Sequence, residues 1–242
     1  MAVPKEAASQ WLEQVKNAHR HGEEQGIVSH VHPCIFTIPE SLRSERPEAY
    51  VPRVVSFGPY HHLKLDLRVY ERDKTNLTIQ FEKKAKRGTF EDLVKYLISL
   101  GEEIRNSFNN QIECGDEVLG WMMARDAVFI LEFFECSDPY GNPRFRQNNP
   151  YFHSESKNPL YFPLHADIFK LENQIPLFIL KKVLEWQIGS ESEALNRLNM
   201  TISSACKKFS PFKDVGDPYR FSTRECYNDL LDGRHILECL YN

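Results

Sequence analysis

Apolar residues recur at helical spacing over most of the chain from residue 68 onward, and this pattern restricts the fold more than any other feature. The stretch 89–108 shows it most clearly, because apolar residues return there at the i, i+3, i+4 spacing of one helix face. Thr89 precedes this stripe and Asp92 follows three residues later, which is typical of a helix N-terminus closed by a capping box. The stripe consists of Phe90, Leu93, Val94, Leu97, Ile98, Ile104 and Phe108. It predicts one continuous buried helix face.

Six further stretches are expected to be helical, namely 5–19, 68–87, 116–136, 166–187, 191–206 and 223–241. The stretch 68–87 ends in a run of lysine and arginine before Gly88, which indicates a helix end. The same basic run also fits a nucleic-acid or nuclear-import segment. Proline removes a backbone amide and crowds the preceding turn, so Pro176 predicts a kink near Glu172–Pro176.

Residues 34–63 interrupt the helical pattern. Four prolines (39, 47, 52 and 59) divide short β-prone pieces, and a residue that precedes proline prefers an extended backbone. We therefore expect an extended segment, or a small edge sheet, that lies over five or six helices. The predicted fold is a mainly α multi-helix domain with a short extended or β N-terminal segment, and the alternative is an α+β fold.

The chain is expected to comprise an N-terminal helix and lead-in over residues 1–33 and a single helical domain over 34–242. Residues 138–163 hold five prolines among polar and aromatic residues, and 207–221 are polar with a proline. Both are expected to be loops. Adaptable loops on a rigid scaffold usually carry binding, so these two are the predicted contact surfaces.

Charge and composition argue against binding to nucleic acid, a membrane span and secretion. The 30 basic and 34 acidic residues give a net charge of −4, which offers no basic footprint for nucleic acid. No apolar run approaches the ~20 residues that a membrane span needs. The first residues lack the apolar core of a signal peptide, and the six cysteines form no C-x-x-C pair. We expect a cytoplasmic protein with reduced thiols, or alternatively a peripheral membrane protein.

Three possible metal ligands, His30, His32 and Cys34, are spaced so that a strand would place them on one face. Pro33 disturbs such a strand and no fourth ligand is identifiable. Polar edge residues beside a buried cysteine are therefore the favoured interpretation. We predict no metal and no cofactor.

His61 and His62 follow the turn Phe57-Gly58-Pro59-Tyr60, Asp126 falls inside the apolar stripe of 116–136, and Glu172 lies near Pro176. If His61, Asp126 and Glu172 faced one cleft, they could perform acid–base chemistry. The alternative is that each acid is paired in the core or bonds a backbone group.

Four motifs in this chain resemble the plant domain of unknown function 247 family. They are Cys34-Ile-Phe-Thr-Ile-Pro39 with Tyr50-Val-Pro52 to Val55-Ser-Phe-Gly-Pro-Tyr-His-His62; Glu71 with Lys74; Met122-Met123-Ala-Arg-Asp126-Ala-Val-Phe129-Ile-Leu131; and Asp167-Ile-Phe-Lys-Leu171-Glu-Asn-Gln-Ile-Pro176. The chain departs from the family pattern at Tyr70, where the family has methionine, and at Ala127, where it usually has glycine.

The resemblance implies a plant-specific protein whose family has no established catalytic residue. Family members are generally longer and usually end in an apolar segment that is interpreted as a membrane anchor. The resemblance therefore implies the N-terminal part of the family domain, as a natural short form or a truncated one. The positions expected to bind something or to hold the fold are Gly58, Pro59, Tyr60, His61, His62, Glu71, Lys74, Asp126, Asp167, Glu172 and Asn173.

Three functions follow as hypotheses. Some grass members of the family are implicated in self-incompatibility, so the first is a non-enzymatic recognition or signalling protein that acts through protein partners. The second is an enzyme or small-ligand binder that uses the cleft of His61, Asp126 and Glu172. The third is a truncated fragment without a role of its own. A buried polar network between the extended segment and the helices would explain the motif residues without any ligand.

Overall fold

A computed structural model describes residues 33–137, 159–209 and 235–239, together with a few positions between 9 and 17. The chain divides into two units, residues 1–32 and 33–242. In the first unit the described positions within the predicted helix 5–19 are helical, and Leu12 and Val15 are exposed. Trp11 and Ala18 lie outside the described residues, so the apolar face of that helix stays a prediction.

The second unit is built from helices, which confirms the mainly α prediction. In chain order they are α2 (Glu40–Glu45), α3 (Pro47–Tyr50), the 3₁₀ turn η1 (Leu65–Leu67), α4 (Glu71–Lys84), α5 (Phe90–Ser99), α6 (Gly101–Asn106), α7 (Asp116–Ser137), α9 (Tyr161–Ile168), α10 (Leu177–Ile188), α11 (Glu191–Phe209) and α13 (Ile236–Cys239). The described residues form isolated bridges in place of strands, and these pair Ile35 with Phe108, Val55 with Arg68 and Pro176 with His235.

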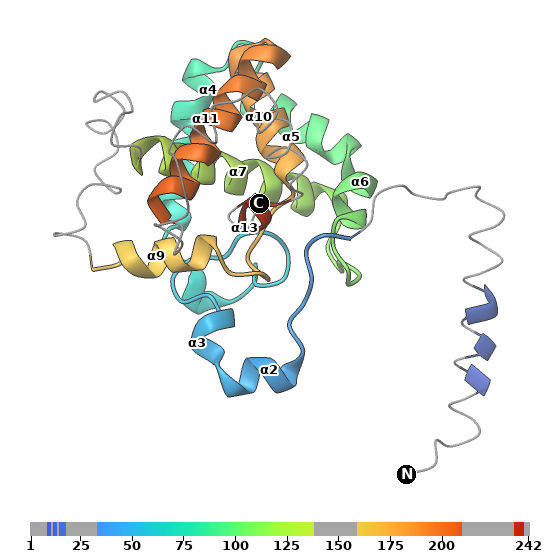
Figure 1. Cartoon of the computed structure of the whole chain (residues 1–242). Coiled ribbons are helices and arrows are strands. Elements are labelled where there is room, and N and C mark those ends of the chain that lie inside the picture. Colours follow the sequence, from blue (N-terminus) through green and yellow to red (C-terminus); the bar gives the residue numbers. More distant parts are fainter. Residues whose placement is uncertain are drawn as a thin grey trace. The chain divides into compact units, whose positions relative to one another are not determined.

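Helix α7 is the centre of this unit, where it contacts α4, α5, α6, α10 and α11 (Figure 1). Nearly every side of α7 between Leu119 and Phe134 is apolar and buried, as expected of a helix surrounded by others. Val118 belongs to the apolar stripe of 116–136, which the sequence predicts to be buried, but 46% of its surface is exposed. It lies in the first turn of α7, before the neighbouring helices cover that face.

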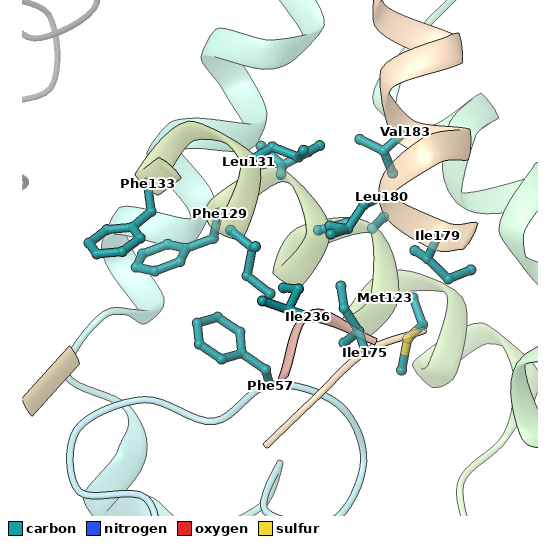
Figure 2. Close-up of a cluster of buried hydrophobic side chains, with 14 of the residues drawn as sticks. Phe57, Met123, Phe129, Leu131, Phe133, Ile175, Ile179, Leu180, Val183 and Ile236 are labelled. Atoms are coloured by element: carbon teal, nitrogen blue, oxygen red, sulfur yellow. The ribbon is translucent and has the colours of Figure 1, made fainter. Parts of the chain in front are cut away.

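The hydrophobic core also includes a residue from the extended segment. Figure 2 shows Phe57 directed at the side chains of α7, and its ring lies 5.7 Å from that of Phe129, centroid to centroid. Leu180 of α10 and Ile236 of α13 belong to the same cluster. Full burial of such a side chain stabilises a fold by about 1.5–3 kcal/mol, so Phe57 anchors the extended segment to the helices.

Helix α5 begins as predicted. Thr89 Oγ1 accepts a hydrogen bond from the Asp92 amide (3.2 Å), and Asp92 Oδ2 accepts one from the Thr89 amide (3.3 Å), which completes the capping box. The predicted stripe is buried except for the half-buried Ile98, but the helix is interrupted at Leu100 and continues as α6. A Cβ atom on Gly120 of α7 would lie 2.6 Å from an Ile98 methylene, so glycine there allows α5 and α7 to pack closely.

Three predicted features have other bounds in the structure than the sequence indicated. The predicted kink at Pro176 is a complete break, since α9 ends at Ile168 and α10 begins only after Pro176, whose backbone is extended (ψ 136°). The first predicted loop was extended too far, because α9 begins at Tyr161; residues 138–158 lie outside the described part. Helix α4 ends at Lys84, so its basic last turn is as predicted, but Gly88 lies four residues beyond its end.

The C-terminal predictions are tested only in part. Helix α11 extends to Phe209, so the predicted loop 207–221 begins too early, and the rest of that loop lies outside the described residues. Within the predicted helix 223–241 the structure describes α13 alone. Tyr227, Leu230 and Leu231, on which that helix was predicted, lie outside the described residues.

Candidate functional site

The segment 33–63 was predicted to be extended, but it also contains the short helices α2 and α3. The motif residues meet where this segment crosses α4, α7 and the connection 169–176 between α9 and α10. We call the following side chains the buried polar network: His61, Lys74, Asp126, Asp167, Lys170, Glu172 and Asn173. Each is more than nine-tenths buried. A polar group in such a position is costly unless it is hydrogen-bonded or paired, so the partners of these side chains indicate their role.

Asp167, near the end of α9, binds the backbone of the extended segment. Its carboxylate accepts hydrogen bonds from three successive amides, those of Arg53 (2.8 Å), Val54 (2.8 Å) and Val55 (3.2 Å). The Lys170 ammonium lies 3.1 Å from Asp167 Oδ1 and also donates to the Val51 carbonyl. The negative charge is therefore neutralised by three backbone amides and one lysine.

Asn173 continues this contact two residues further along the segment. Its Oδ1 accepts from the Phe57 amide (2.7 Å), and its Nδ2 donates to the carbonyls of Val55 (3.1 Å) and Asp167 (2.8 Å). Gln174 acts in the same way within its own connection, where its Nε2 donates to the Ile168 and Lys170 carbonyls. These amides satisfy the backbone groups that the break after α9 leaves without helical partners.

Asp126 of α7 holds the turn that follows Phe57. Its Oδ2 accepts from the Gly58 amide (2.9 Å), and its Oδ1 accepts from Lys74 Nζ (2.7 Å). Lys74, in α4, also donates to the Ser56 carbonyl (2.7 Å) and lies 5.1 Å from the centre of the Phe57 ring. This buried pair joins α4, α7 and the extended segment.

Glu71 extends the same ion pair to the surface. Its carboxylate lies 3.2 Å from Lys74 Nζ and 3.0 Å from Arg125 Nη2. Burial alone would raise the pKa of Glu71, but the charges of Lys74 and Arg125 lower it below its usual value. Glu71 is therefore ionised at neutral pH and serves as a partner of both cations.

Gly58 is required by the geometry of the turn. Its φ of +68° lies in the left-handed region, and a Cβ atom would lie only 2.5 Å from the Gln174 carbonyl oxygen. The turn passes so close to the 169–176 connection that no side chain fits. Pro59, half-buried, directs the chain onward to Tyr60 and His61.

Glu172 binds the beginning of the segment. Its Oε1 accepts from the Ile38 amide and from Arg43 Nη2, both at 2.5 Å, and its Oε2 lies 3.0 Å from His61 Nε2. Burial lowers the pKa of His61 to about 4, with Lys64 and Arg43 acting in the same direction and Glu172 opposing them. His61 is therefore neutral at neutral pH, and the charge of Glu172 is balanced by Arg43.

Tyr60 and His62 are less buried. The Tyr60 hydroxyl donates to Asn109 Oδ1 (2.9 Å) and accepts from the Asn110 amide (3.3 Å), so it ties the turn to the residues after α6. Burial raises the pKa of Tyr60 and lowers that of His62. Both residues therefore remain uncharged at neutral pH.

The structure brings together only part of the proposed acid–base cleft. His61 and Glu172 meet, whereas the described contacts of Asp126 are with Lys74 and the Gly58 amide. Both oxygens of Asp126 and of Asp167 face donors from the chain itself, and Glu172 Oε1 faces two, an arrangement that favours a structural role. Two contributors were not predicted, Arg43 and Lys170. Lys170 could have been suspected from its position three residues after Asp167.

The structure does not test the metal-site hypothesis for His30, His32 and Cys34. His30 and His32 lie outside the described residues, and Cys34 is a buried thiol whose Sγ lies 3.5 Å from the Ser107 carbonyl. Among the residues that the structure describes, no group of histidines, cysteines and carboxylates is placed to hold a metal ion. No helix in the described ranges has the length and apolar character needed to cross a membrane.

Comparison with known proteins identifies relatives in plants. The model of the family DUF247, described as a plant protein of unknown function, matches residues 35–242. The putative UPF0481 protein At3g02645 of Arabidopsis thaliana is 31% identical over 236 residues, which cover 96% of this chain and 41% of that protein. UPF0481 protein At3g47200 of the same plant is 34% identical over 167 residues, which cover 68% of this chain and 34% of that protein. No solved structure matches.

Proposed function

The chain belongs to the DUF247 family of plant proteins, and on that premise we propose that it is a non-enzymatic recognition module that acts through protein partners. The observation that carries the proposal is the use of the motif carboxylates. Asp126, Asp167 and Glu172 all accept hydrogen bonds from amides of the segment 33–63. Carboxylates that accept backbone amides in this way are suited to hold a backbone and poorly suited to move protons.

The segment that the buried polar network holds also displays apolar side chains. Directly after the buried His61, residues 63–69 turn outward, and Leu63 and Leu65 are 78% and 72% exposed. Val69 is exposed as well, while Leu67 between them is buried and anchors the turn. We call Leu63, Leu65 and Val69 the apolar turn. Exposed apolar side chains that gather on one loop are typical of a surface that another protein covers.

Signalling, including a role in self-incompatibility, is the process in which we propose this recognition takes place. The cytoplasm is the proposed location. The predicted contact loops at 138–163 and 207–221 remain proposals, because most of each lies outside the described residues.

The two Arabidopsis relatives are longer than this chain, which limits the proposal to one part of such a protein. The chain spans about two-fifths and one-third of the length of the two Arabidopsis proteins, so the remaining parts of those proteins have no counterpart in this comparison. The module proposed here is the recognition part, and the fragment hypothesis predicts that it binds no partner at all.

The partner hypothesis can be tested by proximity labelling in plant cells. The bait is the chain fused to a biotin ligase, compared with a Leu63→Ser, Leu65→Ser variant. A matched control carries Ile79→Ser and Met200→Ser, which alter two other well-exposed apolar residues (51% and 68%). We expect proteins that label with the wild type and the control but not with the apolar-turn variant. Each such protein is then purified and titrated against all three chains.

A labelling pattern shared by all three baits, or a partner that binds the three purified chains equally, would contradict a role for the apolar turn. The enzyme hypothesis is tested separately with Asp126→Asn. Because Asp126 is paired with Lys74, we expect this variant to unfold at lower temperature, with a loss on the order of 1–3 kcal/mol. An Asp126→Asn protein with unchanged stability would instead support a catalytic acid.

A further inference from the structure

A second site lies away from the buried polar network, where the end of α4 and the C-terminus of α10 meet the first half of α11. A cavity of about 360 Å³ is lined there by Lys84, Lys86, Gln187, Ile188, Glu193 and Arg197. This volume falls within the range of sites that hold small molecules, roughly 300–1,000 Å³. None of the family-motif residues that form the network lines it.

The wall of the cavity carries three cations and one acid. Lys84, Lys86 and Arg197 come from the end of α4, the connection after it and α11, while Glu193 is the single carboxylate. Two parts of the chain that are distant in the sequence, residues 84–86 and α11, thus bring positive charge to one small volume. These side chains can donate hydrogen bonds to the oxygens of an anionic group such as phosphate.

Two of these cations are fixed by acids of α7. Lys84 Nζ lies 3.1 Å from Oε1 of the buried Glu132, and Arg197 Nε lies 2.8 Å from Glu135 Oε1. These acids lie three residues apart along α7. Because their side chains hold the two cations, the charges at the cavity are preorganised and lose less conformational entropy on binding.

Lys86 is positioned by its backbone. Its amide donates to the Gln187 carbonyl (3.1 Å), which joins the connection after α4 to the C-terminus of α10. Gly189 closes α10 in the left-handed conformation (φ +81°), and a Cβ atom there would lie 3.5 Å from that of Lys86. The chain therefore holds the exposed Lys86 beside the cavity.

We propose that this cavity binds a small molecule through a phosphate group, with Lys84, Lys86 and Arg197 as the recognition residues. Arginine and lysine are the residues that most often bind phosphate oxygens. The small volume and the carboxylate of Glu193 oppose a long polyanion and favour a small ligand. The inference does not depend on the apolar turn or on a protein partner.

The acids beneath the cavity give binding a pH dependence. Burial raises the pKa of Glu135, against the opposing charge of Arg197, and the nearby Glu132 raises it further while Lys84 lowers it. A bound phosphate partly neutralises the positive charge of Arg197, which otherwise stabilises the ionised form of Glu135. Glu135 is therefore more easily protonated in the complex. Binding is therefore linked to proton uptake and becomes tighter as the pH falls towards the acid range, as long as the phosphate stays ionised.

The experiment is isothermal titration of the whole chain with inorganic phosphate and with glycerol 3-phosphate, at constant ionic strength set by sodium chloride. We expect saturable binding with a Kd of about 1 mM or tighter. Lys86→Ala should weaken it by about tenfold, the equivalent of one charge-assisted hydrogen bond. Glu193→Gln should tighten binding. Lys83→Ala, a change of an exposed lysine in the same basic run that does not line the cavity, is the matched control.

Three results would overturn the proposal, and the first two concern the soluble probes. One is the absence of saturable binding to either probe by the folded chain. The other is an equal loss in Lys83→Ala and Lys86→Ala, which would indicate general attraction to a basic surface. Vesicles that contain phosphatidic acid distinguish the source of the phosphate. Binding to vesicles without binding to glycerol 3-phosphate would also reject a small-molecule site.

Discussion

Replacing Asp167 with asparagine tests whether the buried polar network holds the fold. The carboxylate accepts three backbone amides and faces the Lys170 ammonium at 3.1 Å. An asparagine side chain keeps one acceptor oxygen, and its NH₂ group would face either an amide or the lysine. Breaking one partner of a buried pair in this way costs about 3–5 kcal/mol.

The assay is thermal and urea unfolding of the 242-residue chain, followed by far-UV circular dichroism. For a chain of this size each kcal/mol lowers Tm by about 2–4 °C, so we expect a fall of roughly 6–20 °C. Asp66→Asn is the control, because Asp66 is exposed in η1 and its change should stay within about 0.5 kcal/mol. If Asp167→Asn destabilises the chain no more than Asp66→Asn, the structural role of Asp167 is refuted.

Three further predictions use the same unfolding measurements or a simple labelling reaction. Gly58→Ala combines an unfavourable φ with a clash against the Gln174 carbonyl and should lose about 2–5 kcal/mol; a normal Tm would contradict this. Because the pKa of His61 is lowered to about 4, the unfolded chain binds more protons than the native chain between pH 6.5 and about 4. The free energy of unfolding therefore falls as the pH falls through this window, by about 3 kcal/mol at most. His61→Gln should flatten that dependence, and an unchanged slope from pH 6.5 to 4 would exclude His61 as its cause. Burial raises the pKa of Cys206 to about 12, so in the native chain iodoacetamide should modify the partly exposed Cys114 long before Cys206. Peptide mass spectrometry measures the two rates, and equal rates would contradict the packing of α11.

Features that depend on a few neighbouring residues could be predicted from the sequence. The capping box of Thr89 and Asp92 was predicted correctly, because both of its residues lie within one helical turn. The short helices α2 and α3 were not, since Pro39 and Pro47 were interpreted as marks of an extended chain. Proline also starts helices, and Pro47 occupies the first turn of α3.

The hydrogen-bond partners of the motif residues could not be predicted from the sequence, for a different reason. The resemblance to a family indicated Asp167 and Glu172, but their partners lie more than one hundred residues away. Helical periodicity does not report such distances. The break at Pro176 has the same origin, because the contacts of Asn173 with the extended segment take the place of another turn of helix.

The long separations in the buried polar network have a consequence for the order of events during synthesis. The Ile38 amide bonds a carboxylate 134 residues later in the chain, and the Arg53 amide bonds one 114 residues later. At about 5–20 residues per second, the acceptors leave the ribosome roughly 6–27 s after the donors. Segment 33–63 is therefore made first in its unit and docked last, after α4, α5 and α7 have been able to pack. A nascent chain arrested before Asp167 should remain open to proteases in this segment, and one arrested well beyond Pro176 should be protected there.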